Sequence, residues 1–317
     1  AFFAHQPERG MSKEIWADLP NSKLTFFSAG SYELFEKQAP NVQKEIKKEF
    51  TIIEEPNDKA IKKSKKLGYL PTKSKTASVN ENRGDFLPST TQMAIDYLSS
   101  RSTNGFFLMV EGGKIDWACH GNDAATVFNE VKDMDDAIKV AYEFYKKHPK
   151  ETLIVVTADH ETGGIVLGTG KYALNLKALQ YQKHSADGLS QRISELRKSK
   201  GNKVTWEDMK TFLGEEMGFW KQFPISWEQE KKLRDEFEQS FVRNKVVFAE
   251  SMYSKSEPMA ARAKEVMDQI SMVGWVSGGH SAGYVPVFAI GAGSQLFGEK
   301  IDNTEIPKRI AKAAGYK

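Results

Sequence analysis

The stretch that decides the fold is residues 153–160, LIVVTADH, in which four aliphatic residues are followed by a short polar end with an aspartate and a histidine. An apolar run of this length, rich in β-branched side chains and closed by polar residues, is typical of a buried strand. Residues 106–110, FFLMV, form a second run of this kind and lead into Glu111. We therefore expect two buried strands, each followed by a carboxylate residue.

A helix is expected between these strands, over about residues 122–147, with Asn122 as its N-cap. Apolar residues recur there at three- and four-residue spacing, and they are Val127, Val131, Met134, Ile138 and Ala141. Strand, helix and strand in this order predict a right-handed parallel crossover. Further strands at about residues 24–27, 51–53 and 285–290 favour an α/β fold with a mostly parallel central sheet and helices on both faces.

The composition is that of a globular protein, with 40% hydrophobic and 27% charged residues in a chain of 317. The 45 basic and 42 acidic residues nearly cancel to a net charge of +3, so charge gives no reason to expect a specific nucleic-acid or membrane partner. No run approaches the roughly 18 apolar residues of a transmembrane helix. The single cysteine, Cys119, cannot form an intramolecular disulfide and leaves the compartment open.

Acidic residues and histidines gather after the expected strands, and open α/β sheets bind their ligands at the carboxyl ends of parallel strands. The residues concerned are Glu111, Asp116, His120, Asp159, His160 and His280. Any one of these histidines alone would more often be an ordinary hydrogen-bonded residue, whereas their combination with carboxylates matches the nitrogen and oxygen ligands that zinc prefers. The other three histidines, His5, His148 and His184, have no such neighbours in the sequence.

Three motifs carry a resemblance to a known family. Residues 110–116, VEGGKID, with His120, residues 157–164, TADHETGG, and residues 278–280, GGH, resemble the metal signatures of alkaline phosphatases and occur in the same order. The resemblance covers the chain from its start to about residue 170 and again over about residues 274–293. It implies an alkaline-phosphatase-like fold. The residues between the two matching parts occupy the place where this family carries a variable subdomain, the crown.

The resemblance also implies ligands for two zinc ions and one magnesium ion. The first zinc would be held by Asp116, His120 and His280, the second by Asp159 and His160, and the magnesium by Glu111. The chemistry agrees, because magnesium prefers carboxylate oxygen and water, whereas mixed nitrogen and oxygen ligands suit zinc.

Residues 4–9, AHQPER, resemble the family segment whose arginine holds the substrate phosphate. A guanidinium group can bind two phosphate oxygens at once, which makes Arg9 the candidate for this role. A surface ion pair is the alternative for Arg9.

Residues 171–270 contain charged helical segments in place of strand patterns. We expect an inserted helix-rich subdomain there, and a metal-binding α/β core from residues 1–170 and 271–317. The apolar stripe of the insert is interpreted as core packing, and it consists of Trp227, Leu233, Phe237 and Phe241. The lysine-rich residues 59–75 are interpreted as a solvated helix and loop, with steering of anionic substrates as the alternative.

Two family features have no match in these 317 residues: the serine nucleophile, with its neighbouring aspartate, and a threonine ligand of magnesium. We expect either a fragment of a complete enzyme or a protein that cannot perform the family reaction. The sequence begins with residues 1–5, AFFAH, without a Met and with the pattern of the inside of an apolar helix, which favours an inactive fragment. Thr162 stands where some relatives place a histidine in the outer shell, which implies different hydrogen bonding there. Trp117 either influences the third metal or packs at a turn, and Cys119 is expected to be a packing residue.

The expected function is therefore metal-dependent hydrolysis of phosphate monoesters by a protein with two Zn²⁺ and one Mg²⁺. The alternatives are a phosphodiesterase or phosphomutase of the same superfamily, and a non-catalytic protein that binds metal or phosphate. The resemblance further implies a periplasmic or secreted protein that forms a homodimer and acts on small-molecule phosphate monoesters.

Overall fold

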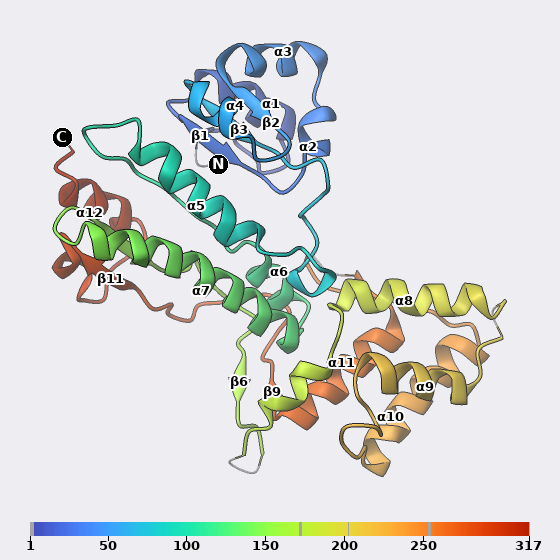
Figure 1. Ribbon diagram of the computed structural model, residues 1–317. Coiled ribbons are helices and arrows are strands. Elements are labelled where there is room, and N and C mark those ends of the chain that lie inside the picture. Colours follow the sequence, from blue (N-terminus) through green and yellow to red (C-terminus); the bar gives the residue numbers. More distant parts are fainter. Residues whose placement is uncertain (1–2, 171–172, 202, 253–254, 317) are drawn as a thin grey trace. The chain divides into compact units, whose positions relative to one another are not determined.

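The computed structural model describes residues 3–170, 173–201, 203–252 and 255–316 (Figure 1). The chain divides into two compact units. The first consists of Ala1–Ala77 and Arg83–Glu111, and the second of Ser78–Asn82 and Gly112–Lys317.

The first unit is built on a three-stranded parallel sheet with the order β1-β3-β2. Its strands are β1 (Phe26–Ser28), β2 (Thr51–Ile53) and β3 (Leu67–Tyr69). Its helices are α1 (Ser12–Asp18), η1 (Leu19–Asn21), α2 (Glu33–Glu36), α3 (Pro40–Glu49), α4 (Asp58–Lys63) and α5 (Phe86–Ser99). Two of the three strands lie where the sequence predicted them, at residues 24–27 and 51–53.

Both faces of this small sheet are covered, because successive side chains of a strand point to opposite faces. Phe27 and Ile52 pack with the buried Leu19, Phe35 and Ile46 of η1, α2 and α3. On the other face, Phe26 and Ile53 pack with residues from α4 and α5, and Figure 1 shows both groups of helices around the strands. The first unit is therefore a three-layer α/β arrangement.

Strand β3 corrects the interpretation of residues 59–75 as a solvated helix and loop. The exposed helix α4 agrees with it, but Leu67, Gly68 and Tyr69 are buried and form the central strand of the sheet. The prediction failed here because three apolar residues between lysines are too short a run to stand out from the charge pattern.

Residues 106–110 form no strand, although a buried strand was predicted. Exposure alternates along them: Phe106 and Leu108 pack on the core beside β3, whereas Phe107 and Met109 are exposed. The segment has the alternation of a strand, but no described strand hydrogen-bonds to it. The predicted parallel crossover from this segment to residues 153–156 is accordingly not seen.

Strands of the second unit are short and pair in twos, always antiparallel among the described residues. The pairs are β4 (Leu153–Val156) with β11 (Phe288–Gly291), β5 (Glu161–Thr162) with β10 (His280–Ser281), β6 (Val166–Leu167) with β9 (Val273–Gly274), and β7 (Ala249–Glu250) with β8 (Lys255–Ser256). Strand β4 confirms the decisive stretch as a strand, although it is half-buried rather than buried. The α/β class is confirmed, whereas a single mostly parallel central sheet is not seen among the described residues.

Helices make up most of the second unit. They are α6 (Lys114–His120), α7 (Ala124–Lys147), α8 (Ala186–Ser199), α9 (Trp206–Glu216), α10 (Trp227–Phe237), α11 (Pro258–Ser271) and α12 (Glu305–Ala313), with the short helices η2 (Val79–Glu81), η3 (Leu176–Tyr181), η4 (Glu238–Val242) and η5 (Ser294–Phe297). Helix α7 confirms the predicted helix but begins two residues later. Its N-cap is Asp123, which accepts a 3.2 Å hydrogen bond from the backbone N–H of Thr126, whereas Asn122 has a left-handed φ of 48°.

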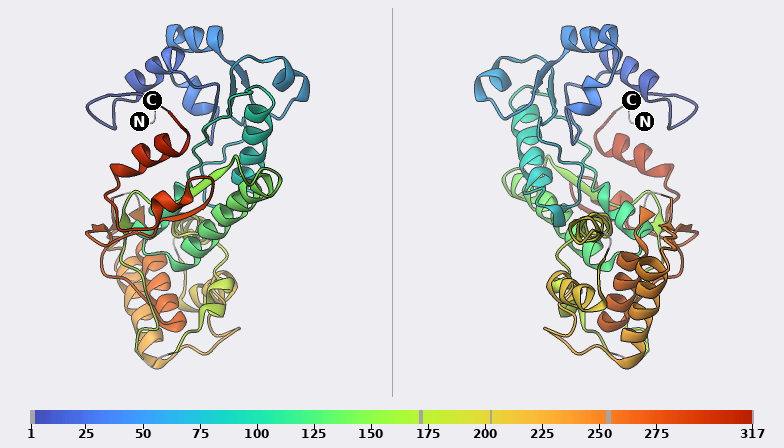
Figure 2. Two further views of the ribbon diagram at one scale, coloured as in Figure 1. Left: turned by 90° about the vertical axis from the view of Figure 1, so that its left-hand side faces the viewer. Right: turned by 90° about the vertical axis from the view of Figure 1, so that its right-hand side faces the viewer.

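Helices α8 to α11 share one hydrophobic core and lie together in all views (Figure 2). This core also includes Ala124 and Ala125 from α7 and Val273 from β9. The region predicted to be rich in helices is therefore helical, and the predicted boundary of an insert at residues 171–270 stays a prediction.

The predicted core stripe, which lies on α10 and η4, is right for three residues and wrong for one. Leu233, Phe237 and Phe241 are buried, but Trp227 at the first helical position is 73% exposed. Trp227 has the same helical spacing as the buried residues, but it lies in the first turn, at the edge of the surface that packs on the core. Helical periodicity alone therefore overestimates its burial.

Trp227→Ala should change the free energy of unfolding by less than about 0.5 kcal/mol, because surface substitutions rarely do more. Leu233→Ala, on the same helix but fully buried, should lower it by about 2–5 kcal/mol. Urea unfolding of both variants checks this. A loss at Trp227 as large as that at Leu233 would contradict the structure.

Across the described residues, no helix is both long enough and apolar enough to cross a bilayer.

Candidate metal centre

Helix α6 carries two of the predicted ligands on one face. Asp116 and His120 are four residues apart, which brings their side chains together along an α-helix. Oδ1 of Asp116 lies 3.4 Å from Nε2 of His120, and the side chain of His120 is fully buried.

Strand β10 brings His280 to the same point, because it pairs with β5 with His280 opposite Thr162. Nε2 of His280 lies 3.1 Å from Nε2 of His120 and 3.7 Å from Oδ1 of Asp116. We call Asp116, His120 and His280 the Asp–His–His group. Within the described ranges it is the one set of three or more such residues whose ligand atoms lie close enough to hold a metal ion.

The separations within the group match a tetrahedral zinc site. Bonds of about 2.0–2.1 Å at tetrahedral angles place neighbouring donor atoms about 3.3 Å apart. The observed separations of 3.1, 3.4 and 3.7 Å bracket this value. Three protein donors also leave a fourth position open, as in catalytic zinc sites.

A backbone carbonyl orients the ring of His120. Its Nδ1 lies 2.7 Å from the carbonyl oxygen of Gly278. Because a carbonyl oxygen can only accept, Nδ1 carries the proton, and Nε2 keeps its lone pair for a ligand. Metal-binding histidines typically make this outer hydrogen bond. Sequence reasoning missed this role of Gly278, since a backbone acceptor leaves no residue-type signal.

Asp159 and His160 form a second pair of donors. Oδ2 of Asp159 lies 3.3 Å from Nε2 of His160, which again fits two donors on one zinc ion. The ring of His160 stacks on that of His280, with 3.7 Å between the ring centroids. The structure therefore brings this pair next to the Asp–His–His group.

Thr162 joins the two sets of donors. Its hydroxyl donates to Oδ1 of Asp116 at 2.7 Å and lies 3.2 Å from Nδ1 of His160. Nδ1 of His160 also lies 3.3 Å from the carbonyl oxygen of Glu161 and so carries a proton. The proton of the hydroxyl is committed to Asp116, so the hydroxyl accepts from His160. This chain of hydrogen bonds leaves Nε2 of His160 free to bind a metal.

Glu161 ties the two strands of the site together. Its carboxylate accepts hydrogen bonds from the backbone N–H groups of Ser281, at 2.9 Å, and Gly164. The side-chain hydrogen bond from Ser281, followed by these backbone N–H groups, lowers the pKa of Glu161. The sequence motif contained Glu161 but did not reveal this role.

Cys119 and Trp117 differ in their surroundings. Cys119 is buried beside Ala118 and Val127, and burial raises the pKa of its thiol to about 12, with the charges of Asp116 and Glu161 adding to the effect. A protonated buried thiol fits the predicted packing role. Trp117 is 45% exposed and lies under the ammonium of Lys114, 3.6 Å from the ring centroid, so it is not a core residue.

Arg9 and Glu111 belong to the first unit, whereas all the donors described above belong to the second. Their roles in phosphate and magnesium binding stay predictions.

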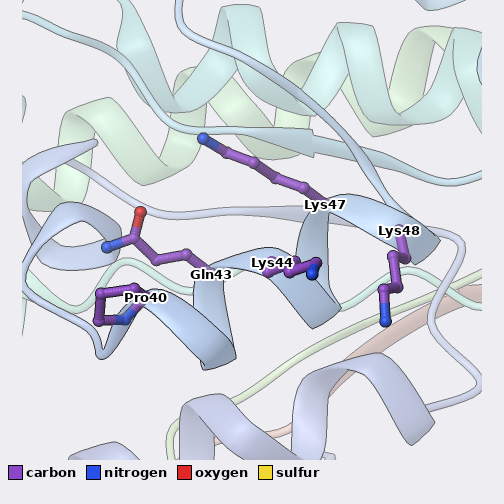
Figure 3. Close-up of a pocket in the computed structure, with 5 residues that line it drawn as sticks. All are labelled: Pro40, Gln43, Lys44, Lys47 and Lys48. Atoms are coloured by element: carbon purple, nitrogen blue, oxygen red, sulfur yellow. The ribbon is translucent and has the colours of Figure 1, made fainter.

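The first unit carries a hollow on the surface of α3. It is lined by Pro40, Gln43, Lys44, Lys47 and Lys48, all from one helix, and Figure 3 shows Lys47 and Lys48 pointing in different directions. Lys48 pairs with Glu45 at 2.6 Å, and the ammonium of Lys47 lies over the ring of Phe35. These lysines do not converge on a common ligand.

The chain belongs to the alkaline phosphatase family, whose model, Alkaline phosphatase, matches residues 66–316. The α/β elements and the Asp–His–His group described above lie largely within this match.

Individual relatives agree with this membership. The chain is 31% identical to Alkaline phosphatase 3 of Bacillus subtilis over 313 residues, which cover 93% of the chain and 59% of that protein. Among solved structures, the cold-active alkaline phosphatase of the psychrophile Shewanella sp. matches with a TM-score of 0.77 and 25% identity, over 99% of this chain and 71% of that one. The alkaline phosphatase of the Antarctic bacterium TAB5 matches with a TM-score of 0.64 and 27% identity, over 100% of this chain and 68% of that one. The chain thus spans about three-fifths of the length of its Bacillus subtilis relative.

Proposed function

We propose that this protein hydrolyses phosphate monoesters with the help of zinc held by Asp116, His120 and His280. The observation that carries the proposal is the spacing of their donor atoms, 3.1–3.7 Å, which suits a single tetrahedral ion. Membership of the alkaline phosphatase family supports the reaction.

A second zinc would be held by Asp159 and His160, whose donors lie 3.3 Å apart. Glu111 would hold magnesium, since carboxylate oxygen is the ligand that this ion prefers. A structure of a TAB5 alkaline phosphatase mutant carries Mg in a site called M3, which supports a magnesium site in the family. Zinc, when bound, would stabilise the entering and leaving oxygens of the phosphate.

The protein's own residues would orient these groups and the substrate. The backbone carbonyls of Gly278 and Glu161 set the tautomers of His120 and His160 through the hydrogen bonds described above. Arg9 would hold the phosphate oxygens with its two-pronged guanidinium group, which is rigid and always charged. Because such a site recognises mainly the phosphate, we propose broad tolerance of the alcohol part of the ester.

The proposal concerns the whole protein, because the chain spans only part of the length of its relatives. For the 317-residue chain alone we propose zinc binding without turnover, since the family's serine nucleophile has no match in it. A periplasmic or secreted location and a homodimer are proposed from family membership.

Removal of metal should abolish turnover by the complete gene product. Treatment with a chelator should lower hydrolysis of a chromogenic phosphate ester by at least about 100-fold, because the metal supplies several kcal/mol of transition-state stabilisation. Zinc plus magnesium should restore it, whereas calcium should not. Turnover that persists without metal would refute the proposal, and zinc binding without any turnover would identify a non-catalytic binding protein.

A further inference from the structure

A buried lysine on α11 holds the end of the helix that carries two of the proposed ligands. Lys264 is 6% exposed, and its ammonium donates a hydrogen bond to the carbonyl oxygen of Gly121. Gly121 follows His120 and is the C-cap of α6. A cation at this point is also favoured by the negative end of the helix dipole. Lys264 therefore restrains α6 directly beside a ligand.

An aspartate one turn further along α11 reaches the other ligand-bearing segments. Asp268 accepts a 3.0 Å hydrogen bond from Nε1 of Trp275. The ring of Trp275 packs against the cluster that contains Cys119 of α6. The same ring covers Gly163, where an added Cβ would lie 2.8 Å from two ring carbons. Asp268 thus holds a side chain that touches both α6 and the turn after β5.

Backbone hydrogen bonds continue this connection to His280. The N–H of Val276 donates to the carbonyl oxygen of Gly163 at 3.0 Å, and the N–H of Gly163 donates to that of Gly279 at 2.9 Å. Helix α11 is therefore linked to α6 directly through Lys264, to the turn after β5 through Trp275, and from that turn to the segment of His280 through the backbone of Gly163.

The burial of these two titratable groups has an energetic cost. Burial lowers the pKa of Lys264, although the nearby carboxyl groups of Asp123, Asp268 and Asp187 act in the opposite direction and raise it. Burial, together with the charge of Asp123, raises the pKa of Asp268 to about 8. Buried charges cost several kcal/mol each unless well paired, and apolar residues of similar size often stabilise a fold better. Stability alone thus gives a weak reason for this arrangement, whereas a fixed position for the ligand segments gives a specific one.

We propose that Lys264, Asp268 and Trp275 are positioning residues of the metal centre, which fix the three ligand-bearing segments relative to one another. The inference rests on the proposed function, because it presupposes that the Asp–His–His group binds zinc. It adds two residues of α11 and one that directly follows β9.

Three variants of the full chain test this: Lys264→Met, Asp268→Leu and Trp275→Phe. Asp268→Leu removes the acceptor of the Trp275 hydrogen bond, and Trp275→Phe keeps a six-membered aromatic ring but loses the N–H donor. The zinc dissociation constant is measured by competition with a chromogenic chelator, and the free energy of unfolding is measured without metal. We expect zinc affinity to fall about 10- to 100-fold, as for other outer-shell changes. The visible absorption of bound cobalt(II), which reports ligand geometry, should also change.

The matched control is Arg197→Met, which breaks a 3.3 Å ion pair with the buried Glu257 at the N-cap of the same helix. It should lower stability while leaving zinc affinity and the cobalt spectrum unchanged. If the three test variants bind zinc like the unaltered chain, or if the control loses as much affinity, the positioning role is refuted and the metal centre stands. If the unaltered chain binds no zinc, the proposed metal centre fails first. Should Lys264→Met not fold, the other two variants decide the question.

Discussion

His280→Ala should lower the zinc affinity of the chain by at least about 100-fold, because loss of a direct ligand exceeds the 10- to 100-fold effect of outer-shell changes. The substitution removes one of the three donors. Only Asp116 and His120 then remain, with donor atoms 3.4 Å apart. Turnover by the complete gene product should fall by a similar factor. Chelator competition and a phosphate ester assay measure the two effects.

His148→Ala is the matched control for this experiment. His148 is exposed at the end of α7, and its ring contacts only Phe144 among the described ring pairs, at 4.7 Å between centroids. It should leave zinc affinity and turnover unchanged. His184 is a poorer control, because its ring lies between Glu81 and Glu216, with separations of 3.6 and 3.4 Å. Equal effects of His280→Ala and His148→Ala would mean that the site is misplaced.

Gly163→Ala should lower the free energy of unfolding by about 2–5 kcal/mol. The φ of Gly163 is 82°, which costs a residue with a Cβ about 1–2 kcal/mol. The Cβ would also lie 2.8 Å from the ring of Trp275 and 3.0 Å from the carbonyl oxygen of Cys119, and overpacking of this kind costs about 1–3 kcal/mol. Urea unfolding without metal measures the loss.

Gly105→Ala separates the two contributions. Gly105 has a φ of 83°, almost the same as Gly163, but a Cβ there would have no atom within 4 Å. It should therefore cost only the backbone part, about 1–2 kcal/mol. If both variants lose the same stability, Trp275 does not pack against Gly163 as described.

Local sequence patterns predicted the secondary structure correctly where an element depends on a long run of neighbouring residues. Helix α7 was predicted because its apolar positions repeat over 24 residues, and β4 because four aliphatic residues follow one another. Strand β3 was missed, since its three residues stand between lysines, and its burial depends on β1 and β2 on either side. Residues 106–110 have strand alternation without a paired strand, which no local pattern can distinguish from a paired one.

The sequence by itself determined which residues are available for metal chemistry and in what order they follow the strands. Asp116 and His120 meet because four residues span one turn of a helix, so their proximity could be argued from spacing alone. The meeting of His280 with them, over 160 residues of chain, depends on the pairing of β10 with β5.

Only the tertiary structure decided the hydrogen bonds that orient these side chains as proposed metal ligands. The carbonyl of Gly278, the hydroxyl of Thr162 and the buried hydrogen-bonding groups of Lys264 and Asp268 act across elements far apart in the chain. Any residue offers a backbone carbonyl, so its role leaves no signal in the sequence. A lysine in a helical segment is predicted to lie on the surface unless the packing around it is known. The physical reason is that spacing encodes only contacts within one element, whereas the orientation of a ligand depends on which elements pack together.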